Sequence, residues 1–194
     1  HKIIHFGIAL RVISRIIEDL HGGWMDAGDV NKYTTFAESA VIQLMEAYRI
    51  NPGAFSDDYC IPESGNGVPD ILDEVKYELD FLKRMQDATG TNGFLLKIGV
   101  DNYNEVSPLS ADTRPKYYLP ECTSGTLAGA AMFAVSGMAI RNHPTLGSYA
   151  EDLLPLNDRL IYASISGFGS EGPDRDRPAF DTVAQASTGF LRLL

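Results

Sequence analysis

Apolar residues recur at every third or fourth position in two long segments in the middle of this chain, and this spacing constrains its fold more than any other feature. The first segment follows Thr35 and the second follows Pro69, and a third helix is predicted over about 124–141. Such spacing places the apolar side chains on one face of an α-helix, which must be buried against another element. The middle of the chain is therefore predicted to be a layer of packed helices.

Capping and breaking residues separate these predicted helices. Thr35 with Glu38 has the spacing of a capping box, and the same pattern in Ser148 with Glu151 predicts the start of a fourth helix. Asn-Pro-Gly at 51–53 is predicted to end the first helix.

The third predicted helix is unusually rich in small residues, which lets neighbouring elements approach closely. It is therefore predicted to lie inside the helical layer. The small residues of the helix are Gly125, Ala128, Gly129, Ala130, Ala131, Ala134 and Gly137.

The segment 90–120 is predicted to be mostly loop, with one short strand at 94–100.

The two ends of the chain differ from the middle. Residues 1–20 have helical apolar spacing with four interior charges, so they predict an amphipathic helix and neither a signal peptide nor a membrane span. A start at His1 predicts a fragment or a processed form. From 154 to 194 an apolar run, a glycine-containing turn and a helix-like segment follow each other, which is typical of α/β structure. Three parts are predicted: 1–20, 21–153 and 154–194.

Composition narrows the function classes. A net charge of −10 argues against nucleic acid and anionic membranes as partners. Two distant cysteines, Cys60 and Cys122, could pair but form no disulfide framework, and the four histidines lack ligand spacing, so no zinc site is predicted.

The segment GGWMDAGD, residues 22–29, places Asp26 and Asp29 three positions apart among glycines. Two carboxylates held close raise the pKa of one of them, which suits a pair that grips a water molecule while one carboxylate takes its proton. The alternative is that Asp26 forms a turn and Asp29 caps the following helix. Spacing alone leaves both interpretations open.

The longer text favours the first interpretation. GGWMDAGDVNKY, followed by IPESGNGVPDILDEVKYELDFLKRMQD, resembles glycoside hydrolase family nine, and the resemblance covers about residues 22–153. It implies a mainly α fold, an incomplete (α/α)6 toroid of about the first third of the family's barrel, with a short α/β segment at the C-terminus. It further implies hydrolysis of β-1,4-glucosidic bonds in cellulose or related β-glucans with inversion. Asp29 would be the general base, and Asp26 would hold the same water.

The same resemblance places the general acid in a downstream glutamate motif that these 194 residues do not contain, so the chain alone is predicted to be inactive. No cofactor is predicted; calcium occurs in the family, but no residues here can be assigned to it. Trp24 is predicted to pack its loop rather than to stack on a sugar. Family membership predicts secretion or a periplasmic location, although no signal peptide is present. Uncovered helix faces predict self-association.

Residues 157–190 resemble a second family, the family III CoA-transferases, which move CoA between carboxylic acids. That family's nucleophilic aspartate lies beyond the matching segment, and Asp181 is predicted to be an ordinary helix N-terminal residue. A fusion in the reading of the gene or the genome assembly is one explanation of the change from a helical to an α/β sequence pattern near residue 155. Two alternatives for the whole chain remain: a CoA-transferase fragment, and a non-catalytic glucan-binding remnant.

Overall fold

The computed structural model describes residues 11–12, 20–102 and 106–154. The chain divides into two units, His1–Leu156 and Asn157–Leu194, and the second lies outside the described residues. The described elements, in chain order, are β1 (Arg11–Val12), β2 (Lys32–Tyr33), α1 (Thr34–Ile50), the 3-10 turn Pro52–Ala54, α2 (Asp70–Asp87), β3 (Leu95–Gly99), the 3-10 turn Leu109–Ala111, β4 (Tyr117–Glu121), α3 (Thr123–Ile140) and α4 (Gly147–Leu153).

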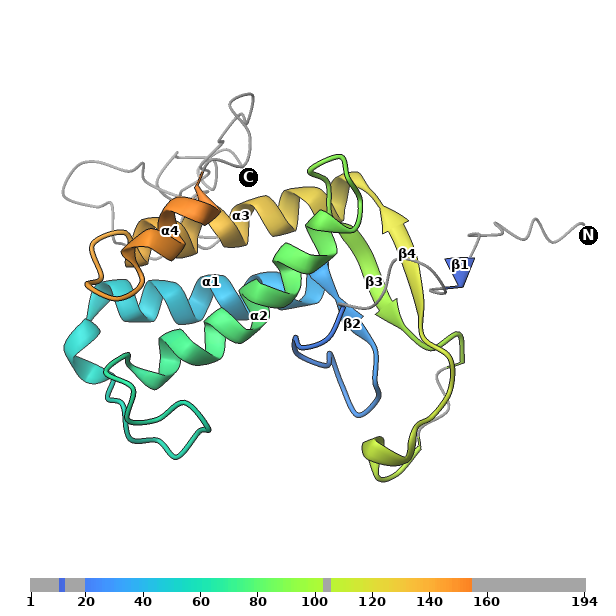
Figure 1. Ribbon diagram of the computed structural model, residues 1–194, viewed down its shortest axis with the longest axis horizontal. Coiled ribbons are helices and arrows are strands. Elements are labelled where there is room, and N and C mark those ends of the chain that lie inside the picture. Colours follow the sequence, from blue (N-terminus) through green and yellow to red (C-terminus); the bar gives the residue numbers. More distant parts are fainter. Residues whose placement is uncertain (1–10, 13–19, 103–105, 155–194) are drawn as a thin grey trace, which may run out of the picture. The chain divides into compact units, whose positions relative to one another are not determined.

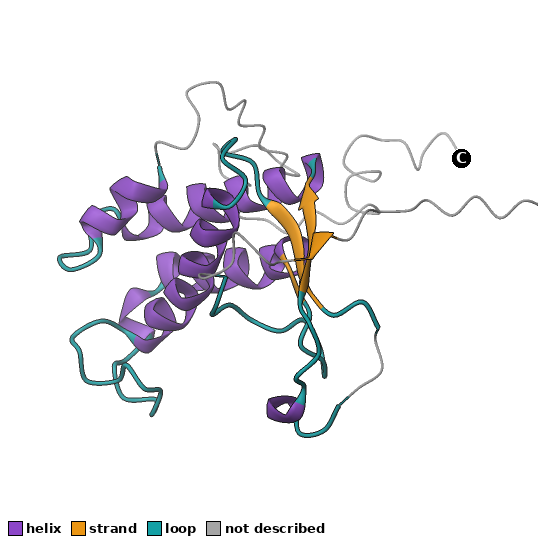
Figure 2. Cartoon of the chain, turned by 45° about the vertical axis from the view of Figure 1, so that its right-hand side comes forward, coloured by secondary structure: helices purple, strands orange, loops and turns teal. Residues whose placement is uncertain are grey.

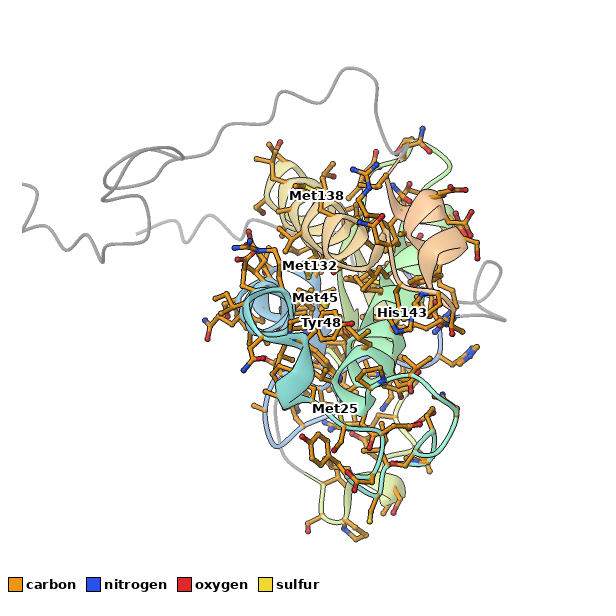
Figure 3. The ribbon with its side chains drawn as sticks, turned by 90° about the vertical axis from the view of Figure 1, so that its left-hand side faces the viewer. Met25, Met45, Tyr48, Met132, Met138 and His143 are labelled. Atoms are coloured by element: carbon orange, nitrogen blue, oxygen red, sulfur yellow. The ribbon has the colours of Figure 1, made fainter. Side chains whose placement is uncertain are left out.

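Four helices pack together, as the sequence predicts for the middle of the chain. Helix α1 packs mainly against α3 and also against α2, and α4 packs on α3 (Figure 1). Met45 of α1 and Met132 of α3 point into the space between these two helices (Figure 3) and are almost completely buried. The helix predicted over 124–141 is confirmed within one residue at each end.

Helix α2 buries the stripe predicted for it. Four apolar residues spaced three or four apart have at most 2% of their surface exposed, and each such side chain contributes roughly 1.5–3 kcal/mol of hydrophobic stabilisation. The helix therefore forms a rigid support for whatever packs on its other residues. The four are Leu72, Val75, Leu79 and Leu82.

The small residues of α3 allow the close packing that the sequence predicts. A Cβ atom at Gly129 would lie 2.6 Å from the Phe94 ring, and one at Gly137 would lie 2.8 Å from Leu154 Cγ. Helix α3 is also long and apolar enough, by length and composition alone, to cross a membrane. In this fold Met132, Phe133 and other residues of α3 belong to the core of the helical layer.

A four-stranded antiparallel sheet lies at one end of the helices (Figure 2), with strand order β1-β4-β3-β2. The strand predicted at 94–100 is confirmed as β3. Strands β2 and β4 are not predicted by the sequence. β2 is too short to show a period, and β4 begins in the segment predicted to be mostly loop, where Pro120 is a residue that disfavours strands. Tyr33 pairs with Lys97, and Lys97 pairs with Leu119, so β3 links the start of α1 to the start of α3.

Both predicted capping boxes are wrong. Helix α1 begins at Thr34, and its N-cap residue Tyr33 makes no side-chain cap. Thr34 Oγ1 instead donates to Leu95 O at 2.6 Å, so a bond to β3 sets this end of the helix. Helix α4 begins at Gly147, also without a side-chain cap.

The helix predicted over residues 1–20 is wrong at Arg11–Val12, which form β1. These two residues pair with Tyr117 and Tyr118 of β4, so an interstrand ladder overrides the local apolar spacing there. Residues 1–10 and 13–19 lie outside the described residues, as does the α/β segment predicted after 154.

Candidate functional site

Asp26 and Asp29 lie on a loop that runs from His21 to Asn31 and leads into β2 (Figure 1, blue). The loop closes on itself, because Asp26 N donates to Asn31 O at 3.0 Å and Asn31 N donates to Asp29 Oδ1 at 2.8 Å. Asp26 is exposed and Asp29 is half-buried. Both carboxylates therefore lie at the surface of a closed, hydrogen-bonded loop.

The alternative role for Asp29, a helix cap, does not fit this geometry. Helix α1 starts five residues later, after Tyr33, and its first turn receives no side-chain cap. Asp29 instead binds the backbone two residues ahead, in a local turn that Asp residues commonly make. This bond fixes one carboxylate oxygen of Asp29 and orients the other.

The environment of Asp26 alters its titration. Partial desolvation and, next, the negative charge of Asp29 raise the pKa of Asp26 above its usual value. The positive charge of Lys97 and a backbone hydrogen bond act in the opposite direction. The raised pKa is the effect expected for two acids held side by side.

Two glycines bring the start of the loop against α2. Gly22 and Gly23 have φ angles of +79° and +77°, in the left-handed region that favours glycine. A Cβ atom at Gly23 would overlap the ring of Phe81 and lie 3.0 Å from Phe81 Cβ. The backbone can therefore lie directly on the face of α2 only because these positions carry no side chain.

Trp24 binds α2 through both of its nitrogen atoms. Its backbone N–H donates to Glu78 Oε2 at 2.6 Å, and its indole Nε1–H donates to Glu74 Oε1 at 2.7 Å. The side chain is half-buried and packs against the hydrophobic core, so Trp24 packs the loop as the sequence predicts.

The other end of the loop rests on β3. Asn31 is fully buried, and its Oδ1 accepts the Val100 N–H at 3.0 Å. Gly99 allows this close contact because it has no side chain. A Cβ atom at position 99 would overlap Asn31 Oδ1 and lie 2.9 Å from Asn31 Cα. Lys97, also buried, has its Nζ 5.0 Å from the centre of the Tyr33 ring.

The sequence alone did not identify Glu78, Lys32 and Lys97 as residues of this site, although two of them stand out in the sequence. Glu78 interrupts the apolar stripe of α2, and Lys97 interrupts an apolar strand. Charged residues are almost never fully buried unless they are paired, so a charge within such a stripe marks a functional or structural contact. No comparable pattern surrounds Lys32.

Glu78 predicts a pH-dependent stability. Burial raises the pKa of Glu78 from 4.5 to about 7, against the opposing effects of the Trp24 N–H and Lys32. The stability from this group is therefore complete below pH 4.5 and is lost as pH rises through 7, by about 3 kcal/mol. The urea midpoint, followed by Trp24 fluorescence, is expected to fall from pH 5 to pH 8 in the natural chain and much less in Glu78→Gln. Equal slopes in the two proteins would contradict this.

Within residues 11–12, 20–102 and 106–154, no group of three His, Cys, Asp or Glu side chains is arranged to hold a metal ion. Cys60 and Cys122 are both free thiols, so the pairing left open by the sequence is absent.

Comparison with known proteins decides the family. The family model of glycosyl hydrolase family 9 matches residues 14–160. The chain belongs to glycosyl hydrolase family 9. A curated family relative, cellulose 1,4-beta-cellobiosidase of Acetivibrio thermocellus, is 36% identical over 146 residues, which are 68% of this chain and 16% of the relative. The chain thus spans about a sixth of that relative's length.

Solved structures agree with the expected fold class. A metagenome-derived family 9 endoglucanase superimposes with a TM-score of 0.62 at 35% identity, covering 69% of this chain and 24% of that one. The prediction of a mainly helical, incomplete (α/α)6 barrel is confirmed.

A second family matches the end of this family 9 chain. The model of CoA-transferase family III matches residues 127–194. Acetyl-CoA:oxalate CoA-transferase of Acetobacter aceti is 52% identical over 46 residues, which are 24% of this chain and 12% of that protein. The second resemblance noted in the sequence is therefore confirmed, and the two matched ranges overlap between residues 127 and 160.

Proposed function

We propose that residues 20–154 form the water-activating half of a glycoside hydrolase site that cleaves β-1,4-glucosidic bonds of cellulose or a related β-glucan with inversion. The observation that carries the proposal is the pair Asp26 and Asp29, adjacent on a surface loop whose two ends are anchored to α2 and β3. Similarity to a cellobiosidase and to an endoglucanase supports a glucan as the substrate.

In this mechanism Asp26 and Asp29 hold one water molecule between them. Asp29 takes a proton from that water as its oxygen attacks the anomeric carbon, while Asp26 orients the water. Because the Asn31 N–H fixes Asp29 Oδ1, the other carboxylate oxygen of Asp29 is the one assigned to the proton. Inversion requires a general acid on the opposite side of the sugar, with the two carboxyl groups about 6.5–9.5 Å apart.

Glu78 has the pKa of a general acid, but its position excludes it from this role. It is 1% exposed, and its Oε2 accepts the backbone N–H of Trp24. A carboxyl group of α2 that is buried beneath the loop cannot reach the oxygen of a glycosidic bond at the exposed surface of the loop. The acid is therefore assigned to the downstream glutamate motif that the family resemblance implies.

The test compares the chain alone with a complete site. The 194-residue chain is expected to release no reducing sugar from amorphous cellulose above background. A chimera, in which residues 20–154 replace the matched quarter of the metagenome-derived endoglucanase, is expected to hydrolyse cellulose. An inactive but folded chimera would overturn the proposal, and turnover by the chain alone that Asp29→Asn abolishes would overturn the assignment of the acid.

Two other functions make different predictions for the same samples. A non-catalytic glucan-binding remnant would retain cellulose binding in Asp29→Asn while the chimera stays inactive. A CoA-transferase role, favoured by the match over residues 127–194, would require the chain to bind acetyl-CoA in calorimetry.

Secretion and self-association are further proposals. The exposed apolar residues Phe36, Leu127 and Met138 support self-association, which sedimentation would measure.

A further inference from the structure

Glu78 and Lys32 are two buried or half-buried charges that the proposed reaction does not use. Glu78 Oε2 accepts the N–H of Trp24 at 2.6 Å, and Lys32 Nζ donates to the carbonyl oxygen of Gly22. Glu78 and Lys32 thus bind backbone groups two residues apart, on the segment that leads to Asp26. Their opposite charges also attract each other.

The same face of α2 supplies further contacts to this segment. Arg84 donates to His21 O at 2.9 and 3.1 Å, and Glu74 accepts the indole N–H of Trp24. Positions 74, 78, 81 and 84 lie three or four residues apart, so they share one helix face. The loop therefore lies on a pre-formed set of donors and acceptors on a rigid helix.

We propose that Glu78 and Lys32 are positioning residues, which hold the peptide units of Gly22 and Trp24 so that Asp26 stays beside Asp29. The importance of this positioning for catalysis rests on the proposed function. Neither residue touches the water or the sugar in this scheme. Each acts through the backbone of the loop.

The charge states of the two residues make this contact sensitive to pH. Burial raises the pKa of Glu78 to about 7 and, for Lys32, lowers the pKa below its usual value. Hydrogen bonds to an ionised acceptor are roughly twice as strong as neutral ones, so the Trp24 N–H is held more tightly once Glu78 loses its proton.

Charged groups from each neighbouring element act on this pair. Glu78 is influenced by Lys32 at β2, by the Trp24 N–H of the loop and by Glu74 of its own helix. Lys32 is influenced by Glu78 and Arg84 of α2 and by Lys116, which precedes β4.

The test follows backbone amide protons of the full chain by nitrogen–proton NMR between pH 5 and pH 9. The amides of Trp24 and Asp26 are expected to shift together, with a midpoint near pH 7. The amide of Gly65 is the matched control: it donates to Asp57, whose pKa is lowered by the N–H groups of Gly67 and Gly65, and it is expected to stay constant in this range.

Two variants assign the transition. Glu78→Gln keeps an acceptor for Trp24 but cannot ionise, so the midpoint near pH 7 is expected to disappear. Glu74→Gln changes the partner of the indole and removes a charge that raises the pKa of Glu78, so it is expected to keep the transition with a lower midpoint. A transition that survives in Glu78→Gln would overturn the inference, and so would an invariant Trp24 amide in the natural chain, which requires no variant to fold.

This readout involves neither glucan nor turnover. Its failure would leave the roles of Asp26 and Asp29 intact. An inactive chimera combined with a normal Trp24 titration would instead remove the proposed function alone.

Discussion

Asp29→Asn in the chimeric endoglucanase is expected to lower kcat/KM on soluble cello-oligosaccharides by about 10²–10⁴-fold, the usual contribution of general base catalysis. An amide cannot take the proton of the attacking water. The carbonyl oxygen of asparagine can still accept the Asn31 N–H that Asp29 Oδ1 accepts, so the loop is expected to keep its conformation. The measurement is the initial rate of product release.

Two controls separate loss of the base from loss of structure. Sodium azide is a nucleophile that needs no base, so it is expected to restore turnover in Asp29→Asn and to form a glycosyl azide of inverted configuration. Asp87→Asn makes the same chemical change at an exposed position at the end of α2 and is expected to leave the rate unchanged. An Asp29→Asn chimera as fast as its parent would exclude Asp29 as the base.

Gly23→Ala is expected to destabilise the described unit by about 4 kcal/mol, combining backbone strain with overpacking. The φ angle of Gly23 is +77°, and the new methyl group would overlap Phe81 at its Cγ and Cδ1 atoms. Phe81 is fully buried within the core, so it has no space into which it can move. Urea unfolding followed by Trp24 fluorescence measures the effect, because Trp24 is the chain's single tryptophan.

Gly65→Ala is the matched control for this prediction. Gly65 has a φ angle of +91°, but no atom lies within 4 Å of a Cβ built there. The substitution therefore carries the backbone strain without the steric overlap, and a loss of about 1 kcal/mol is expected. Equal losses at the two glycines would show that Phe81 does not press on the loop.

Local sequence was sufficient for α1 and α2 because their apolar stripes are long and regular. In α2 the spacing of Leu72, Val75 and Leu79 identified both the helix and its buried face. The sheet was predicted only at β3, since β2 is a two-residue strand that exists through pairing with Lys97 and Ile98. Capping motifs failed where tertiary contacts decide the helix end, as Thr34 shows with its bond to Leu95 O.

The sequence by itself predicted the helical layer, mainly through the periodic apolar residues of α1 and α2, and the candidate acids Asp26 and Asp29, through a long motif that resembles a known family. Only the tertiary structure decided what holds these acids in place: Glu78 lies 54 residues from Trp24 along the chain, yet the two are hydrogen-bonded. Periodicity reports which face of a helix is buried, but it does not report what lies against that face. A charge such as Glu78 or Lys32 acquires its role only when folding removes water from it and supplies a partner.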